Sequence, residues 1–255
     1  MAHPAPAGES ERRPEERLRA SSVSRAYEGV QALQNVSLDL HRREVVGLIG
    51  PNGAGKSTLV NLLTGFDFPT AGGILLGDRD VTRWSSHRRA RHGVARSFQH
   101  SRSFRGLSVR ENVEVSALGS GAGPREARRR SQALLGALRL AGQAESRADA
   151  LPHGDERRLG VARVLATEPA FVLMDEPAAG LPEAEVPQFA DVIRSARDEH
   201  GCGVLLIDHN MALVMAVCDR IHVLDQGRTL AAGTPAEVRG NIDVAAAYLG
   251  ETAVV

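Results

Sequence analysis

The stretch VVGLIGPNGAGKSTLVNLLTG, residues 45–65, decides the fold of this chain. Its first six residues form a continuous apolar run, which is typical of a strand buried on both faces. In its second half, Leu59, Leu62 and Leu63 recur at helical spacing and predict an amphipathic helix. Between the two, residues 50–57 fit the pattern G-x-x-x-x-G-K-S/T. A strand, this glycine-rich loop and a helix in succession predict a phosphate-binding loop.

The chemistry of phosphate binding explains the residue types in this loop. Glycines let backbone N–H groups curl around phosphate oxygens, and the amino terminus of the next helix adds partial positive charge. We predict that Lys56 neutralises the β- and γ-phosphates and that Ser57 offers its hydroxyl to Mg²⁺. The alternative is a chance glycine turn, and the flanking strand and helix argue against it. The predicted nucleotide-binding residues of the loop are Gly50, Pro51, Asn52, Gly53, Ala54, Gly55, Lys56, Ser57 and Thr58.

Acidic and histidine side chains follow two further apolar segments. In FVLMDE, residues 171–176, Asp175 and Glu176 come at the carboxyl end of a predicted strand, where ligands bind in open α/β sheets. We predict that Asp175 holds Mg²⁺ through water and that Glu176 orients the attacking water or accepts its proton. His209 follows the apolar run VLLI in the same way. Acidic turns and structural histidines are common at strand ends, but beside a phosphate loop these residues form a set.

Apolar strands that alternate with helical segments predict an α/β fold with a mostly parallel sheet. We expect a P-loop NTPase core of the RecA-like type, an N-terminal antiparallel β subdomain and an inserted α-helical subdomain. The insertion is an Arg- and Ala-rich segment in which strand signals are sparse. Strands and hairpins are predicted at residues 18–39, 45–50, 72–82, 171–174, 203–207 and 220–233.

Composition indicates a single domain after a short tail. Residues 1–17 contain no apolar segment, and their Pro, Ala, Arg and Glu content predicts a disordered tail. The domain is expected at residues 18–250, with its core at 18–96 and 164–250 and the helical subdomain at about 97–163.

Charge and hydropathy exclude several classes of protein. The 31 basic and 31 acidic residues balance, which argues against a nucleic-acid partner bound by bulk charge. No apolar run approaches the length of about 18 residues that a spanning helix needs. The arginine clusters at residues 88–91 and 128–130 are predicted to be solvated helix faces.

Together these residues resemble the ATP-binding cassette (ABC) ATPases that power membrane transport, from about residue 18 to 250. Gln99 in ARSFQHSRSF matches the family's Q-loop, His209 its switch histidine and Tyr27 the aromatic residue that stacks on adenine. The segment LPHGDERRLGVARVLA, residues 151–166, is similar to the signature segment, which is normally LSGGQ followed by a basic helix. The resemblance implies ATP and Mg²⁺ as cofactors. It implies Glu176, His209 and Gln99 as catalytic residues, and Ser57, Gln99 and Asp175 around the metal.

Shorter strings resemble the subgroup that serves branched-chain amino acid and related importers. They include MDEPAAGL, GTPAEV and the terminal AYLGE. This resemblance implies a peripheral ATPase at the cytoplasmic face of the cell membrane, with an indirect link to a solute-binding protein. It implies transmembrane permease subunits that dock near residues 99–110, from Gln99 to Arg110.

Two alternatives belong to other classes of function. A non-transport cassette that acts on nucleic acid or ribosomes would carry a long coiled-coil insertion or a second cassette, and this chain has neither. A non-hydrolysing nucleotide sensor would lack Glu176 or His209, and both are present. We therefore expect no nucleic-acid partner.

The signature segment departs from its family. Two cassettes of the family close head to tail, so that each signature helix caps the ATP on the other chain. The usual serine is replaced by Pro152, which has neither a hydroxyl nor an N–H to donate. His153 could supply a replacement donor, and the nucleotide-facing backbone needs no side chain at Gly154. Asp155 stands where glutamine is usual, and its carboxylate is unfavourable beside a triphosphate unless it caps its own helix, which Asp does well.

A second departure points the same way. The family often has S-A-L-D after its acidic pair, and this chain has Ala179-Gly180-Leu181-Pro182. Both departures lie in segments that would face the nucleotide bound to the partner. The residues that would bind the chain's own nucleotide match those of the family. The hypothesis is a heterodimer with a second, different ABC ATPase subunit, in which the reciprocal site is slow. The alternative is a homodimer of a subgroup in which backbone donors suffice.

Overall fold

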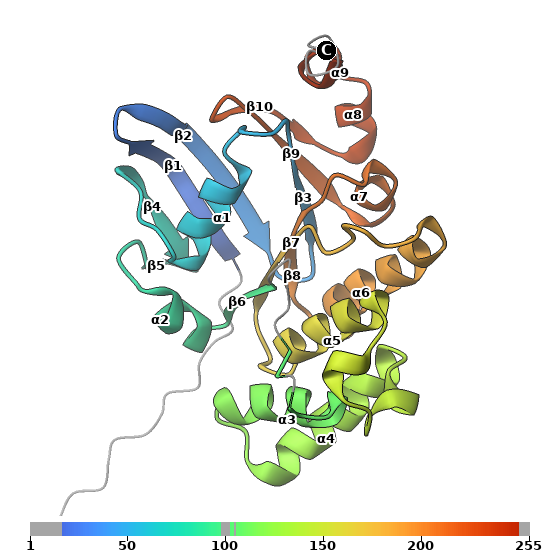
Figure 1. Cartoon of the computed structure of the whole chain (residues 1–255). Coiled ribbons are helices and arrows are strands. Elements are labelled where there is room, and N and C mark those ends of the chain that lie inside the picture. Colours follow the sequence, from blue (N-terminus) through green and yellow to red (C-terminus); the bar gives the residue numbers. More distant parts are fainter. Residues whose placement is uncertain (1–16, 98–102, 105, 250–255) are drawn as a thin grey trace, which may run out of the picture.

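The computed structural model describes residues 17–97, 103–104 and 106–249. In Figure 1 an antiparallel sheet lies on one side of a central sheet, and helices cover the other side and the lower end. Most of the expected tail and Gln99 lie outside the described residues. Arg17 belongs to the first strand, so that strand begins one residue earlier than the predicted domain boundary.

The N-terminal sheet is antiparallel, with the strand order β2-β1-β4-β5 among the described residues. Of residues 28–34, which look like a turn and connector in the sequence, residues 28 and 29 form the turn and residues 30–34 belong to β2, where Leu33 is buried in the core and the amide of Gln34 donates to the Gly227 carbonyl. The strands are β1 (Arg17–Tyr27), β2 (Val30–His41), β4 (Ala71–Leu76) and β5 (Arg79–Asp80).

The central sheet has the order β10-β9-β3-β8-β7-β6 in the described part of the chain. All neighbours run parallel except β9 and β10, which form an antiparallel hairpin. The expected α/β class with a mostly parallel sheet and an antiparallel N-terminal sheet is confirmed. The strands are β3 (Val45–Ile49), β6 (Val94–Ser97), β7 (Phe171–Asp175), β8 (Gly203–Ile207), β9 (Arg220–Asp225) and β10 (Arg228–Gly233).

Alternation along these strands fills two separate cores. In β7, Phe171 and Leu173 pack with the antiparallel sheet and α1, whereas Val172 and Met174 pack with the helices on the other face. The same alternation divides Leu205 from Leu206 in β8. Because both faces of the central sheet are covered, the side chains that point to either face are apolar. The strands therefore show as continuous apolar runs in the sequence.

The helices are divided between the two faces and the lower end of the central sheet (Figure 1). Those between β6 and β7 gather below the sheet, in agreement with an inserted helical region. The α-helices are α1 (Lys56–Thr64), α2 (Ser86–Arg91), α3 (Val109–Gly119), α4 (Pro124–Ala137), α5 (His153–Leu165), α6 (Val186–Asp198), α7 (Met211–Val217), α8 (Pro235–Arg239) and α9 (Ile242–Leu249). Short 3-10 helices are η1 (Ala141–Gln143), η2 (Ala148–Ala150) and η3 (Glu183–Glu185).

In the first arginine cluster, Arg88 and Arg91 are exposed as predicted, but Arg89 is not part of a solvated helix face. Arg89 is 0% exposed and donates to the carbonyls of Leu62, Leu63, Val81 and Thr82. Burial lowers its pKa to about 10, so the guanidinium stays charged at neutral pH. The prediction failed because the last carbonyls of α1 have no helical partner and need a donor from outside the helix. Arg89 thus ties the end of α1 to the segment after β5.

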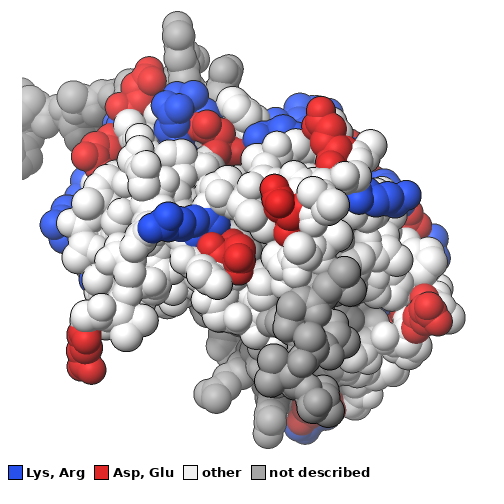
Figure 2. Space-filling view, turned by 90° about the horizontal axis from the view of Figure 1, so that it is seen from above, with Lys and Arg blue, Asp and Glu red and all other residues white. Residues whose placement is uncertain are grey.

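The helices and the surface charges of the described residues agree with the hydropathy and charge balance of the sequence. Within the described ranges, no helix has the length and apolar character to cross a bilayer. On the face seen from above in Figure 2, basic and acidic side chains are interspersed among uncharged ones. That face therefore carries no extended basic patch in its described residues.

Candidate nucleotide-binding site

Three neighbouring parallel strands bring the predicted residues to one edge of the sheet. Strand β8 pairs with β3 on one side and β7 on the other. The phosphate loop follows β3, Asp175 ends β7 with Glu176 next, and His209 comes two residues after β8. Because the carboxyl ends of parallel strands meet at one edge, residues more than 150 positions apart in sequence share one site.

The phosphate loop has the backbone that its glycines predict. Gly50 has φ +146°, and a β-carbon there would collide with the Leu224 carbonyl. Gly55 has φ +100°, and its β-carbon would lie 2.7 Å from the Ala32 carbonyl oxygen. Both positions therefore require glycine. Gly55 also precedes α1 without a side-chain cap, which leaves this helix start to backbone donors.

The Lys56 side chain curls back over the loop. Its ammonium donates to the carbonyls of Gly50 at 2.5 Å and Pro51 at 2.8 Å. Asn52, Gly53 and Ser57 are exposed, while Gly50 and Ala54 are buried and the rest of the loop is half-buried. The loop thus presents an ammonium, a hydroxyl and backbone to the solvent side of the sheet edge.

Glu176 and His209 touch each other at this edge. The Nε2 atom of His209 lies 3.0 Å from Oε1 of Glu176. The His209 side chain is 52% exposed and the Glu176 side chain is 27% exposed, so water can reach both. Glu176 has φ +46°, a conformation that costs a residue with a β-carbon about 1 kcal/mol or more. Its amide donates to the Ile207 carbonyl at 2.7 Å, which fixes β7 to β8 at this point.

Asp175 has a basic partner that the sequence did not reveal. Arg96 in β6 donates through Nη2 to Oδ2 of Asp175 at 2.6 Å and through Nη1 to Asn61 of α1 at 2.7 Å. The guanidinium thereby links the end of β7 to the helix that follows the phosphate loop. A charged residue inside a short apolar strand is the signal that could have found it.

The donors at this edge fit magnesium. Among the described residues, no three His, Cys, Asp or Glu side chains gather to form a metal cage. Asp175 and the exposed hydroxyl of Ser57 offer oxygen ligands at the same sheet edge. Mg²⁺ is commonly held by one or two protein oxygens together with phosphates and water, so this sparse oxygen set suits it.

Tyr27, the predicted adenine platform, is held by a charged pair. Its hydroxyl donates to Oδ2 of Asp67 at 2.5 Å, and the Arg25 guanidinium lies 4.4 Å from the ring centroid. Burial alone would raise the pKa of Asp67, but hydrogen bonds from Tyr27 and the Phe68 amide, with the Arg25 charge, lower it. The ring is 40% exposed, and a base that stacks on it would use the face opposite Arg25.

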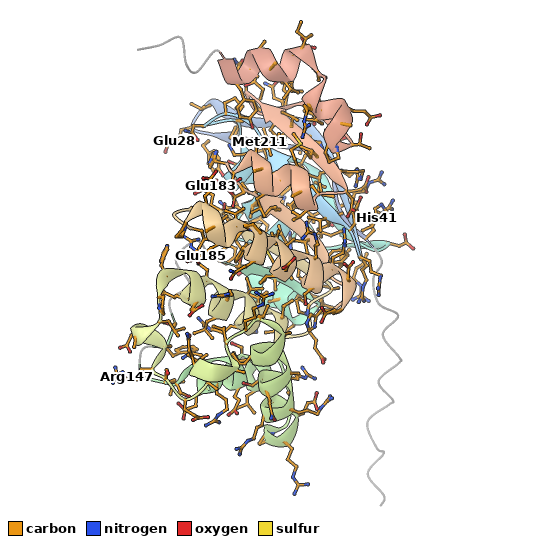
Figure 3. All side chains as sticks on the ribbon, turned by 90° about the vertical axis from the view of Figure 1, so that its right-hand side faces the viewer. Glu28, His41, Arg147, Glu183, Glu185 and Met211 are labelled. Carbon is orange, nitrogen blue, oxygen red and sulfur yellow. The ribbon has the colours of Figure 1, made fainter. Side chains whose placement is uncertain are left out.

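The predicted signature segment begins α5 as expected but carries an extra carboxylate. Pro152 precedes the helix and gives it no side-chain cap. Gly154 is buried, and a β-carbon there would collide with Oε2 of Glu185. Figure 3 shows Glu185 and Glu183 on the same side of the molecule as Glu28, with His41 on the opposite side. An acidic side chain therefore lies against the first turn of α5.

Asp155 does not cap its own helix. It is 7% exposed, accepts from Nε2 of Gln143 at 2.8 Å and forms an ion pair with Arg158. The expectation of a cap was wrong because Asp155 lies inside the first turn, where its side chain turns towards η1. This carboxylate is engaged within the helical region.

The structure brings the loop residues, Asp175, Glu176 and His209 together at one sheet edge. His153 and Gly154 contact a different set of residues, which includes Glu185 and Gly180. Gln99 lies outside the described residues. Sequence reasoning missed Arg96 and a second arginine, Arg157, that reaches from α5 to the carbonyls of Glu176 and Pro177.

This arrangement defines the class of protein: a P-loop nucleoside triphosphatase with an acidic pair and a contacting histidine at the carboxyl edge of its sheet. The sequence profile of the ABC transporter family matches residues 33–179. The chain belongs to this family, among its ATPase subunits. A profile described as branched-chain amino acid ATP-binding cassette transporter matches residues 228–254.

Relatives and solved structures agree with this placement. The chain is 43% identical to the high-affinity branched-chain amino acid transport ATP-binding protein LivG of Salmonella typhimurium, over 92% of this chain and 98% of that protein. An ATP-binding cassette of an ABC transporter in its ADP conformation superimposes with a TM-score of 0.83 at 25% identity, over 92% of this chain and 99% of that one. A dimeric bacterial ABC transporter cassette gives 0.75 at 25% identity, over 86% and 98%.

Proposed function

We propose that this chain binds and hydrolyses ATP to energise a membrane importer for branched-chain amino acids or related small polar solutes. One observation supports hydrolysis above all: Glu176 and His209 are in contact at the sheet edge that carries the phosphate loop. The solute class rests on the similarity to LivG and on the profile match at residues 228–254.

The residues divide the work of phosphoryl transfer to water. Backbone N–H groups of the loop and the Lys56 ammonium bind the β- and γ-phosphates and stabilise the charge that spreads over them in the transition state. Glu176 orients the attacking water and accepts its proton, and His209 holds the Glu176 carboxylate in place. Mg²⁺ would neutralise phosphate charge when held by Ser57, Asp175 and, by family resemblance, Gln99. Tyr27 stacks on the adenine base.

The cassettes of this family dimerise and work with transmembrane permeases. For this chain we propose a heterodimer, in which Pro152, His153 and Gly154 face the γ-phosphate on a partner cassette. The permeases dock near residues 99–110, at the cytoplasmic face of the membrane. The helices between β6 and β7 support the proposed division into a core, residues 18–96 and 164–250, and a helical subdomain at about 97–163.

Three measurements on one preparation test this function. The tagged chain is extracted from its native membranes, the intact complex is weighed by native mass spectrometry, and ATP hydrolysis and solute uptake are measured after reconstitution into proteoliposomes. We expect two permeases, a second and different cassette, and ATP hydrolysis that rises when leucine and the solute-binding protein are added. Two copies of this chain would contradict the heterodimer. A rate of ATP hydrolysis that no branched-chain amino acid raises would contradict the proposed solute class.

A further inference from the structure

Arg157 connects two parts of the molecule that serve different nucleotides. It lies one turn into α5 and donates through Nη1 to the carbonyl of Glu176 at 3.0 Å and to that of Pro177 at 3.1 Å. The same guanidinium lies 3.2–3.3 Å from Nε2 of His153, the first residue of α5. One side chain thus spans from the helix start to the backbone that carries the catalytic glutamate.

The backbone at Glu176 needs such support. Its φ of +46° lies in the left-handed region, which residues with a β-carbon occupy when their surroundings hold them there. The Glu176 amide is fixed by the Ile207 carbonyl, and two residues on the Ala178 amide donates to Oδ2 of Asp208 at 2.9 Å. Arg157 holds the intervening carbonyls. The Glu176 carbonyl also accepts from the Ala179 amide at 3.2 Å, so without Arg157 the middle of the turn keeps that bond and loses the side-chain donor to the Glu176 and Pro177 carbonyls.

The charge around Arg157 suits this task. Burial lowers its pKa, while the negative charges of Asp208, Glu156 and Glu176 act in the opposite direction. A half-buried guanidinium among three carboxylates stays ionised, and its planar fork can reach two carbonyls at once. Lysine keeps the charge but lacks the fork.

The contact with His153 makes the link sensitive to the start of α5. An arginine N–H can donate to Nε2 only in the His153 tautomer that leaves a lone pair on that atom. Gly180 lies beside the same ring, since a β-carbon there would be 3.6 Å from Nε2. A change in the His153 ring at the partner-facing turn therefore reaches Arg157 directly.

We infer that Arg157 is a positioning residue that holds the Glu176 backbone in its left-handed conformation and couples it, through His153, to the helix start that faces the partner's nucleotide. This inference rests on the proposed function, because it takes Glu176 as the group that acts on water. Arg157 itself touches neither water nor phosphate in this scheme.

The test compares Arg157→Lys and Arg157→Ala with a matched control, Arg194→Ala. Arg194 also donates to a backbone carbonyl, that of Ala216 at 3.1 Å, and pairs with Asp191, but it lies on α6 away from the site. Each variant is assembled with its permeases and partner cassette in nanodiscs. The readouts are kcat and KM for basal ATP hydrolysis, the Hill coefficient for ATP, the affinity of the isolated chain for a fluorescent ATP analogue, and Tm.

Displacement of a catalytic group by about 1 Å can lower the rate by about 100-fold. We expect Arg157→Ala to lower kcat by at least about tenfold and Arg157→Lys by less, with KM and analogue affinity within about twofold of the wild type. In Arg157→Ala the Hill coefficient for ATP should fall towards 1, because the coupling between the two nucleotide sites through His153 is lost. Arg194→Ala should leave all values unchanged.

The opposite results are as clear. A kcat within about twofold of the wild type in Arg157→Ala would overturn the inference, as would a rate loss matched by an equal loss of analogue affinity. If Arg157→Ala does not fold, Arg157→Lys decides by the same criteria. Basal hydrolysis needs no amino acid, so a wrong solute class would contradict the proposed function and leave this comparison standing. A wild-type complex that hydrolyses no ATP would overturn both.

Discussion

The phosphate loop and the start of α5 are both helix starts suited to phosphate, and they are built differently. At the loop, Gly50 and Gly55 permit the backbone conformation and Lys56 supplies positive charge. At α5, Pro152 offers no donor, and the Glu185 carboxylate lies against Gly154. In the proposed dimer, the first site serves the chain's own nucleotide and the second its partner's.

Under the proposed function, this difference would let the chain's own ATP site and the site it offers to its partner change independently. The loop lies between a buried strand and a helix, and substitution at either glycine would force backbone atoms together. The α5 start depends on dipole and backbone N–H groups, which tolerate many side chains nearby. Four substitutions, ordered by expected effect, sharpen or break the comparison.

Glu176→Gln should have the largest effect, on the side of the chain's own nucleotide. A glutamine can hold His209 but cannot accept a proton from water, so the rate of ATP hydrolysis should fall about 1,000-fold. Single-turnover hydrolysis by the assembled complex measures this, and ATP affinity should stay within about twofold. Glu199→Gln, at an exposed helix end, is the control. A rate within tenfold of the wild type would remove Glu176 from its proposed role.

Arg89→Met should destabilise the phosphate-loop side while sparing α5. Four carbonyl oxygens would lose a buried charged donor, which should lower the free energy of unfolding by about 3 kcal/mol. Urea titration gives the total. Hydrogen exchange should then rise more in α1 than in α5, and the exposed Arg91→Met should change neither. Equal increases in hydrogen exchange in α1 and α5 would show that the Arg89 hydrogen bonds do not stabilise α1 more than α5.

Pro152→Ser tests the α5 side. Serine restores a hydroxyl and a backbone donor at the helix start. If the reciprocal ATP site is slow because these are missing, the ATPase rate of the assembled complex should rise about threefold. Pro124→Ser, at the start of α4, is the matched control. No change in rate would mean that backbone donors suffice, and the two helix starts would then be equivalent in function.

Glu185→Gln should give the smallest change. Removal of a negative charge from a helix start favours anion binding by about 0.3–1 kcal/mol. The ATP-dependent association of the two cassettes, measured with Glu176→Gln present to prevent hydrolysis, should tighten about twofold. The neighbouring Glu183→Gln is the control, because Glu183 is exposed in the same turn. Weaker association would show that the Glu185 carboxylate supports the interface instead of opposing it.

Local sequence determined most of the site. Residues 45–65 predicted a strand, a phosphate loop and a helix, and β3 and α1 are found there. Asp175, Glu176 and His209 were predicted from their place after apolar runs, and parallel strand pairing brings them to one edge. Such signals are readable because a strand end and its next residue are neighbours in sequence as well as in space.

Tertiary structure alone decided which side chains meet across the fold. Arg96 reaches Asp175 from 79 residues away, and Arg157 reaches the Glu176 carbonyl from 19 residues away. The sequence predicted Arg89 as a solvated charge, but in the fold it is buried and donates to the unpaired carbonyls at the end of α1. Spacing along one element reveals its buried face, whereas the partner of a long side chain depends on strand register and helix placement. Those become fixed when both cores have packed.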